Sequence, residues 1–219
     1  MRGSAWLCLL GVSACAHRAP ESKPDTAASA SPVSSSANSV PVTAAATADP
    51  IRYTYSASSE TTLTFVGSDI SGRRKGSFGK FNGTIVVSNG SPEQASVTVE
   101  IDVTSLRADP AELETQLKSA SFLNVAKYPS AHFESTSVVN GGKLGATDTV
   151  KGNLLLRGVR RPVEIPATIH VRPTGVDVDA ELTIQRKDFG LVFPGKRDAL
   201  VKDDIVLSLQ VVATAVTPR

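Results

Sequence analysis

The sequence predicts an all-β domain: an antiparallel β-barrel of about eight strands with one α-helical excursion. From Ile51 onward, apolar and polar residues alternate in many short segments, which is the pattern of strands with one buried face. Gly-rich or polar turns separate these segments, and only one stretch has a helical pattern. Strands joined mostly in sequence order favour an up-and-down barrel, although a β-sandwich fits the same pattern.

The alternation is clearest in 97–103, where apolar residues occupy odd positions, and in 176–184, where they occupy even positions. Successive side chains of a strand point to opposite faces, so each of these segments presents one apolar face to an interior. Further strands are expected from the same reasoning at 61–70, 76–89, 131–139, 143–156, 163–169 and 205–211.

The helical stretch is expected at 110–118. Asp109 is a candidate N-cap, and Pro110 suits the first helical position. Leu113 and Leu117 are four residues apart and therefore share one face of the helix.

The N-terminus predicts export. Arg2 precedes a short apolar run, 5–12, which is too short to span a bilayer as a helix. The sequence 12–15, Val-Ser-Ala-Cys, resembles the bacterial lipoprotein lipobox. This resemblance implies a signal peptide at 1–14 and acylation of Cys15, which would anchor the protein in a membrane; an ordinary secretory signal or an uncleaved start is the alternative.

The segment 15–50 is expected to be a lipidated, disordered tether in front of a domain at 51–215. Ala, Ser, Thr and Pro dominate residues 16–50, and Phe, Tyr, Trp, Leu and Ile are absent from them, so the segment cannot bury enough apolar surface to fold. No Asp follows Cys15, and for Gram-negative lipoproteins this implies the outer membrane, facing the periplasm. A Gram-positive host is the alternative.

Charge and motifs argue against catalysis and against nucleic-acid binding. The net charge is only +2, and basic residues do not concentrate in one stretch. Cys8 and Cys15 are the only cysteines, His132 and His170 are expected to face outward, and no catalytic motif set is complete. No enzyme activity, metal or cofactor is therefore expected. Two basic turns, at 73–75 and 158–161, are expected to be solvated, with anionic lipid headgroups as the alternative partner.

Four blocks in sequence order resemble the YceI-like family of bacterial polyisoprenoid-binding domains, which have a lipocalin-like barrel. The blocks are G-S-F-G-K-F-N-G-T-I at 76–85, the passage from Leu117 to Phe133 that contains F-L-N-V-A-K-Y-P, the G-N-L…R-P-V hairpin at 152–163, and R-K-D-F-G at 186–190 with the final strand. The sequence departs from the family pattern at 58–62, Leu123 and Leu155.

The resemblance implies a tunnel that holds an isoprenoid chain, an isoprenoid quinone tail or another elongated apolar lipid. Periodicity alone leaves open a filled core that docks a protein partner instead, and a homodimer also stays open. The residues expected to contact the ligand are Phe65, Phe78, Phe81, Val99, Ile101, Phe122, Tyr128, Phe133, Leu154, Leu156, Val178, Leu182, Ile184, Phe189 and Phe193.

The segment 119–136 is expected to fold across one end of the barrel. Phe122 and Tyr128 would lie at the mouth and Phe133 would point inward, because Pro129 ends any helix and precedes a strand. A gate over a tunnel and a closed hydrophobic plug are the two interpretations.

Overall fold

The computed structural model describes residues 49–172 and 174–216. The expected signal peptide, the acylation site at Cys15 and nearly all of the expected tether lie outside the described residues.

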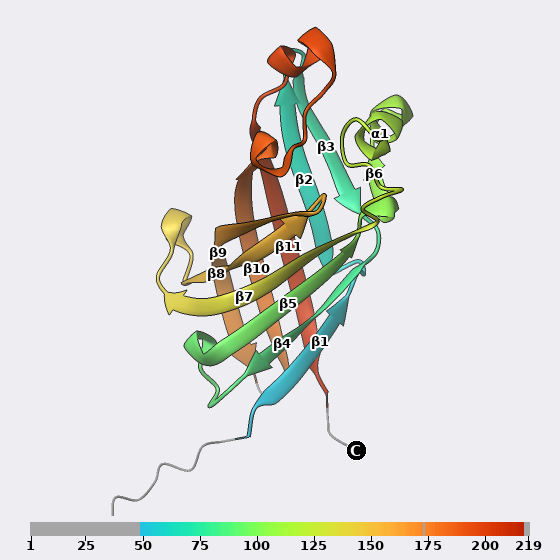
Figure 1. The fold of residues 1–219 in the computed structure, drawn as a ribbon. Coiled ribbons are helices and arrows are strands. Elements are labelled where there is room, and N and C mark those ends of the chain that lie inside the picture. Colours follow the sequence, from blue (N-terminus) through green and yellow to red (C-terminus); the bar gives the residue numbers. More distant parts are fainter. Residues whose placement is uncertain (1–48, 173, 217–219) are drawn as a thin grey trace, which may run out of the picture. The chain divides into compact units, whose positions relative to one another are not determined.

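The described chain consists of eleven strands, one α-helix and five short 3₁₀ segments (Figure 1). The strands and the helix are β1 (Ile51–Ser56), β2 (Thr62–Asp69), β3 (Gly72–Phe78), β4 (Phe81–Val87), β5 (Ala95–Asp102), β6 (Leu106–Ala108), α1 (Ala111–Lys118), β7 (Ser130–Asn140), β8 (Asp148–Leu156), β9 (Val159–Arg172), β10 (Gly175–Gln185) and β11 (Asp204–Ala215). The 3₁₀ segments are η1 (Pro92–Gln94), η2 (Val103–Ser105), η3 (Lys143–Gly145), η4 (Arg186–Phe189) and η5 (Gly195–Leu200).

Eight strands close into an antiparallel barrel in the order β1-β4-β5-β7-β8-β9-β10-β11, which confirms the predicted fold class. The ring closes where the end of β11 pairs with β1, with Ala215 opposite Tyr53. The first half of β11 pairs instead with β2, with Val206 opposite Val66. The hairpin of β2 and β3, with β6 at its outer edge, therefore extends the wall at one end of the barrel (Figure 1).

The strands differ from the expected ones most clearly in four places, and β9 also extends the expected strand 163–169 at both ends, to 159–172. The expected strand 76–89 is two strands, β3 and β4, which pair with different partners and are separated at 79–80. Neither β1 nor the three-residue β6 was expected. The expected strand 143–156 begins only at Asp148, because 143–145 form a 3₁₀ turn in which Leu144 has a φ of 61°.

The helix begins one residue later than expected, at Ala111, and the expected cap is wrong. Pro110 takes the N-cap position with extended backbone angles, and no side chain caps the helix there. Leu117 is buried and Leu113 is half-buried, so the shared apolar face expected from their spacing does pack against the domain.

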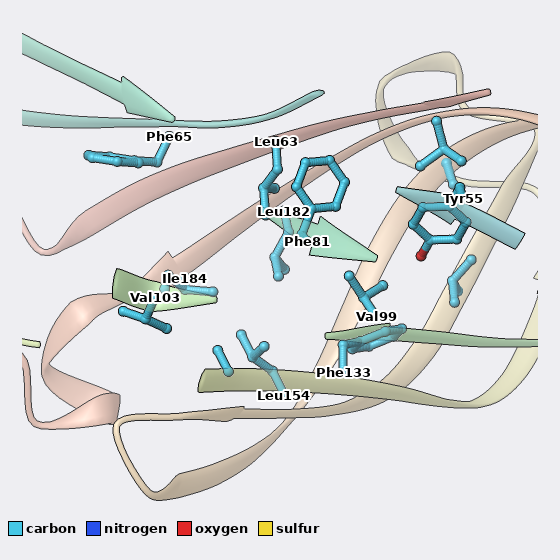
Figure 2. Close-up of a cluster of buried hydrophobic side chains, with 14 of the residues drawn as sticks. Tyr55, Leu63, Phe65, Phe81, Val99, Val103, Phe133, Leu154, Leu182 and Ile184 are labelled. Carbon is cyan, nitrogen blue, oxygen red and sulfur yellow. The ribbon is translucent and has the colours of Figure 1, made fainter. Parts of the chain in front are cut away.

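Large apolar side chains from the strands fill much of the barrel interior (Figure 2). Val99, Phe133 and Leu154 occupy matching register positions on the neighbouring strands β5, β7 and β8. Because partners in register point to the same face, these three side chains form one apolar row across the wall. Gly152 lies in the same wall, and a Cβ atom there would come within 2.6 Å of the Phe133 ring.

Candidate functional site

The barrel is not completely filled. An inner cavity of about 100 Å³ lies among the barrel strands, and an outer cavity of about 380 Å³ lies toward α1 and the segment 186–203. The two cavities share Ile101, Leu154 and Leu207 in their walls. They therefore form two neighbouring compartments, and the outer one is in the size range of small-molecule sites, about 300–1,000 Å³.

The inner cavity offers no free polar group. Every residue in its wall is apolar except Tyr55. The Tyr55 hydroxyl donates a hydrogen bond to the carbonyl oxygen of Thr98 at 3.1 Å, and burial raises the pKa of the phenol well above its usual range. Since the hydroxyl stays protonated and already has a partner, this compartment suits only hydrocarbon.

The outer cavity changes character along its length. Its deep wall is apolar and includes Phe65, Phe122 and Phe193, all buried. Its other end is formed by the β2–β3 turn and by 197–202, where Ile70 and Leu200 are exposed. Residues that line a cavity and also face solvent mark its opening. We call the segments 67–74 and 196–202 the mouth rim.

A fully buried arginine organises the chain on one side of the mouth. Arg186 has no exposed surface, and its guanidinium donates to the carboxylate of Asp198 and to the backbone carbonyl oxygens of Leu191, Asp198, Val201 and Lys202. A guanidinium has five N–H donors, and here each has an acceptor. Arg186 thus ties together a loop that has few backbone ladder bonds of its own.

Two phenylalanine rings join this loop to the segment that follows α1. Phe122 and Phe193 stack with centroids 4.4 Å apart and an interplanar angle of 21°. Arg186 lies on Phe193, with its guanidinium carbon 6.0 Å from the ring centroid. The backbone N–H of Phe193 also donates to Asp198, at 2.9 Å. The stacked pair forms part of the wall of the outer cavity. Phe122 belongs to the segment after α1, and Arg186 and Asp198 hold Phe193 in place.

Twelve of the fifteen expected ligand contacts lie in the walls of the two cavities. They are Phe65, Phe78, Val99, Ile101, Phe122, Phe133, Leu154, Leu156, Val178, Leu182, Ile184 and Phe193. Whether these residues touch a ligand stays a prediction.

Phe81, Tyr128 and Phe189 line neither cavity, so the structure does not bring them to this candidate site. Phe81 and Phe189 are buried in the core. Tyr128 lies over the β8–β9 turn, where a Cβ atom on Gly158 would come within 2.7 Å of its ring. Tyr128 therefore packs on a turn, and Phe122 alone of the expected pair reaches the cavity.

Sequence reasoning missed Arg186, Tyr55 and the rim segment 196–202 as parts of the site, and it named 73–75 only as a basic turn. Arg186 was named only as a member of the R-K-D-F-G block. The alternation of apolar and polar residues cannot predict that a charged side chain is buried. Tyr55 belongs to the unexpected strand β1. His170 is exposed and His132 is half-buried, and no group of three or more metal-binding side chains occurs within 49–172 and 174–216.

Fold and cavity together define a lipocalin-like barrel protein with an apolar interior that opens at one end. The chain belongs to the YceI-like family, since the YceI-like domain matches residues 53–213. This finding confirms the resemblance drawn from the four sequence blocks.

Relatives and solved structures agree with this assignment. The chain is 35% identical over 136 residues to a UPF0312 protein of Pseudomonas putida, covering 59% of this chain and 70% of the relative. It is 38% identical over 122 residues to a UPF0312 protein of Pectobacterium atrosepticum, covering 53% and 62%.

Among solved structures, BcnA of Burkholderia cenocepacia is similar with a TM-score of 0.63 and 23% identity, covering 70% of this chain and 96% of BcnA. A polyisoprenoid binding domain from Saccharophagus degradans, implicated in plant cell wall breakdown, is similar with a TM-score of 0.54 and 14% identity, covering 74% and 98%. These structures bear out the fold. In the part of the chain that the structure describes, no helix has the length and apolar character needed to cross a membrane.

Proposed function

We propose that the barrel binds a long apolar lipid of isoprenoid type without transforming it chemically, and so carries, stores or sequesters that lipid at the cell envelope. The observation that carries this proposal is the inner cavity, whose only polar side-chain group, the Tyr55 hydroxyl, is already hydrogen-bonded. The polyisoprenoid binding domain of Saccharophagus degradans, with a similar fold, supports the choice of ligand class.

The two compartments imply an orientation for the ligand. A hydrocarbon tail would lie in the inner cavity and the deep outer cavity, and the polar end of the lipid would lie at the mouth rim, where charged groups and backbone are exposed. Burial of apolar surface contributes roughly 25 cal/mol per Å², so a prenyl tail could bind tightly without any hydrogen bond in the interior. A quinone tail and a polyprenyl chain both meet this requirement.

A substitution in the shared wall tests the proposal. Leu154→Trp would place a larger side chain between the two cavities and should abolish binding of a long prenyl lipid, measured by native mass spectrometry after lipid loading. Leu144→Trp adds the same ring at a position that is 87% exposed, and should bind as the parent protein does. Equal loading of both variants would contradict the assignment of the cavities as the ligand site.

We also propose that the protein is a lipoprotein acylated at Cys15 and held at the outer membrane facing the periplasm. The support is the lipobox-like sequence at 12–15 and the absence of Asp after the cysteine. Two acyl signals give stable anchoring, whereas a single chain binds only marginally. The intact mass of the protein from its own host should exceed the mass of residues 15–219 by the acyl groups. Cys15→Ser should carry no acyl group and should keep residues 1–14, because cleavage before the cysteine follows its acylation.

A further inference from the structure

The mouth rim exposes aliphatic side chains to water. Ile70, in the turn between β2 and β3, is 76% exposed, and Leu200 of η5 is 46% exposed. The backbone N–H of Ile70 donates to the carbonyl oxygen of Leu200 at 3.1 Å, so the two residues lie side by side. Both also line the outer cavity. The cavity therefore opens next to an apolar surface that the described residues leave exposed.

The same rim is positively charged. Five basic residues and two acidic residues occur within 67–74 and 196–202. Both acidic groups are already paired, Asp69 with Arg74 and Asp198 with the buried Arg186. Among the described residues, no ion pair involves the other four basic side chains, all of which are exposed: Arg73, Lys196, Arg197 and Lys202.

The rim lies at one end of the barrel. Figure 1 shows the β2–β3 hairpin and the segment with η5 side by side at this end, and the start of β1 and the end of β11 at the opposite end. Bonds between the two rim segments, such as Lys202 N–H to the Ser68 carbonyl oxygen at 2.9 Å, hold them together. Ile70, Leu200 and the four exposed basic residues thus belong to two segments that are joined to each other at one end of the barrel.

We propose that the mouth rim docks on the surface of a bilayer that contains anionic lipids. Ile70 and Leu200 enter the interface between headgroups and acyl chains, and the four cations contact lipid phosphates. An apolar tip surrounded by Lys and Arg is the pattern of interfacial membrane binding, and each cation near an anionic surface adds to the affinity. Such docking would let a lipid pass from the bilayer into the outer cavity. This part of the proposal rests on the proposed function.

Vesicle flotation tests the docking directly. Residues 15–219 with Cys15→Ser contain every described element and lack the expected acylation site. This protein should bind vesicles that are made of equal parts of phosphatidylcholine and phosphatidylglycerol. It should bind vesicles of pure phosphatidylcholine much less. High salt should release it, because exposed charges are screened.

Matched variants locate the binding surface. Arg197→Glu should weaken binding to the anionic vesicles at least about five-fold, and Ile70→Ser should weaken it about ten-fold. Lys143→Glu and Leu144→Ser make the same kinds of change at exposed positions of the β7–β8 connection, outside the mouth rim, and should leave binding unchanged. Thermal unfolding of each variant shows whether the domain stays folded. If Ile70→Ser does not fold, Leu200→Ser is used in its place.

Separate readouts distinguish this proposal from the proposed function. Prenyl-lipid binding is measured in detergent solution without vesicles. If the folded rim variants bind vesicles as the parent does, or if the parent does not prefer anionic vesicles, the docking proposal is overturned. If vesicle binding follows the expected pattern while no prenyl lipid is bound in solution, docking is supported and the proposed function is not.

Discussion

The buried guanidinium of Arg186 donates a hydrogen bond to the carboxylate of Asp198, twelve residues further along the chain. Asp198 in turn accepts the backbone N–H of Phe193, whose ring forms part of the outer cavity wall. One ion pair thereby fixes both the course of the mouth loop 186–203 and the position of an aromatic ring in the cavity. It explains how a segment without regular ladder bonds can form one side of the opening.

Loss of the arginine should destabilise the domain. Arg186→Leu removes the donor to four backbone carbonyl oxygens and one partner of the Asp198 carboxylate, and the free energy of unfolding should fall by about 3 kcal/mol. Chemical denaturation measures this change. Arg160→Leu, at an exposed position, is the matched control and should change stability by less than about 0.5 kcal/mol. Equal effects of the two substitutions would contradict the structural role of Arg186.

The same ion pair predicts a pH dependence. Arg186, through its hydrogen bond, holds the pKa of Asp198 below its usual range. A carboxylate with a depressed folded-state pKa contributes stability above its unfolded-state pKa, about 4, and this contribution is lost as the pH falls through the folded-state pKa. The stability difference between the parent protein and Asp198→Asn should therefore be full at pH 6 and shrink steadily below pH about 4. A difference that stays constant down to pH 2 would contradict the account.

The contact between Gly152 and Phe133 predicts that no side chain larger than that of glycine fits at position 152. A methyl group at 152 would come within 2.6 Å of the ring and within 2.4 Å of the Glu134 carbonyl oxygen. Gly152→Ala should therefore cost about 1–3 kcal/mol of stability through displacement of the ring and the strand. Gly67→Ala is the control on β2, where an added Cβ meets nothing within 4 Å. Its cost should be close to zero.

Removal of one ring of the stacked pair should loosen the outer cavity. Phe193→Ala removes the partner of Phe122, and the large-to-small change should cost about 3 kcal/mol of stability. Hydrogen exchange in 186–203 should become faster than in the parent protein, while exchange in β10 stays slow. A prenyl lipid should also dissociate faster. Unchanged dissociation would show that the aromatic pair does not retain the ligand.

The barrel could be predicted because its signal is local and repeated. In β10 the residues Val176, Val178, Ala180, Leu182 and Ile184 alternate with polar ones. The structure pairs this strand antiparallel with β11 along its length and with β9 over 175–180. Such a strand carries its own evidence for one buried face. The same signal predicted the inward side of Val99, Val178 and Leu182, which line the inner cavity.

Features that depend on distant parts of the chain were not predictable in this way. The run 76–89 has no strong turn residue pair at 79–80, yet β3 leaves the barrel ring to pair with β2 and β6 while β4 joins β1 and β5. The burial of Arg186 depends on acceptors up to sixteen residues away. Tyr128 was expected at the mouth because it lies in the connecting segment just before Pro129, and only the three-dimensional structure shows it on the β8–β9 turn.

The most direct test of the central claim is native mass spectrometry of the protein purified under mild conditions from its own cell envelope. We expect part of the protein to carry one bound apolar lipid of isoprenoid type, which is released on denaturation and is absent from Leu154→Trp. Protein that carries no lipid, and that does not take up a long prenyl lipid when one is offered, would contradict the account.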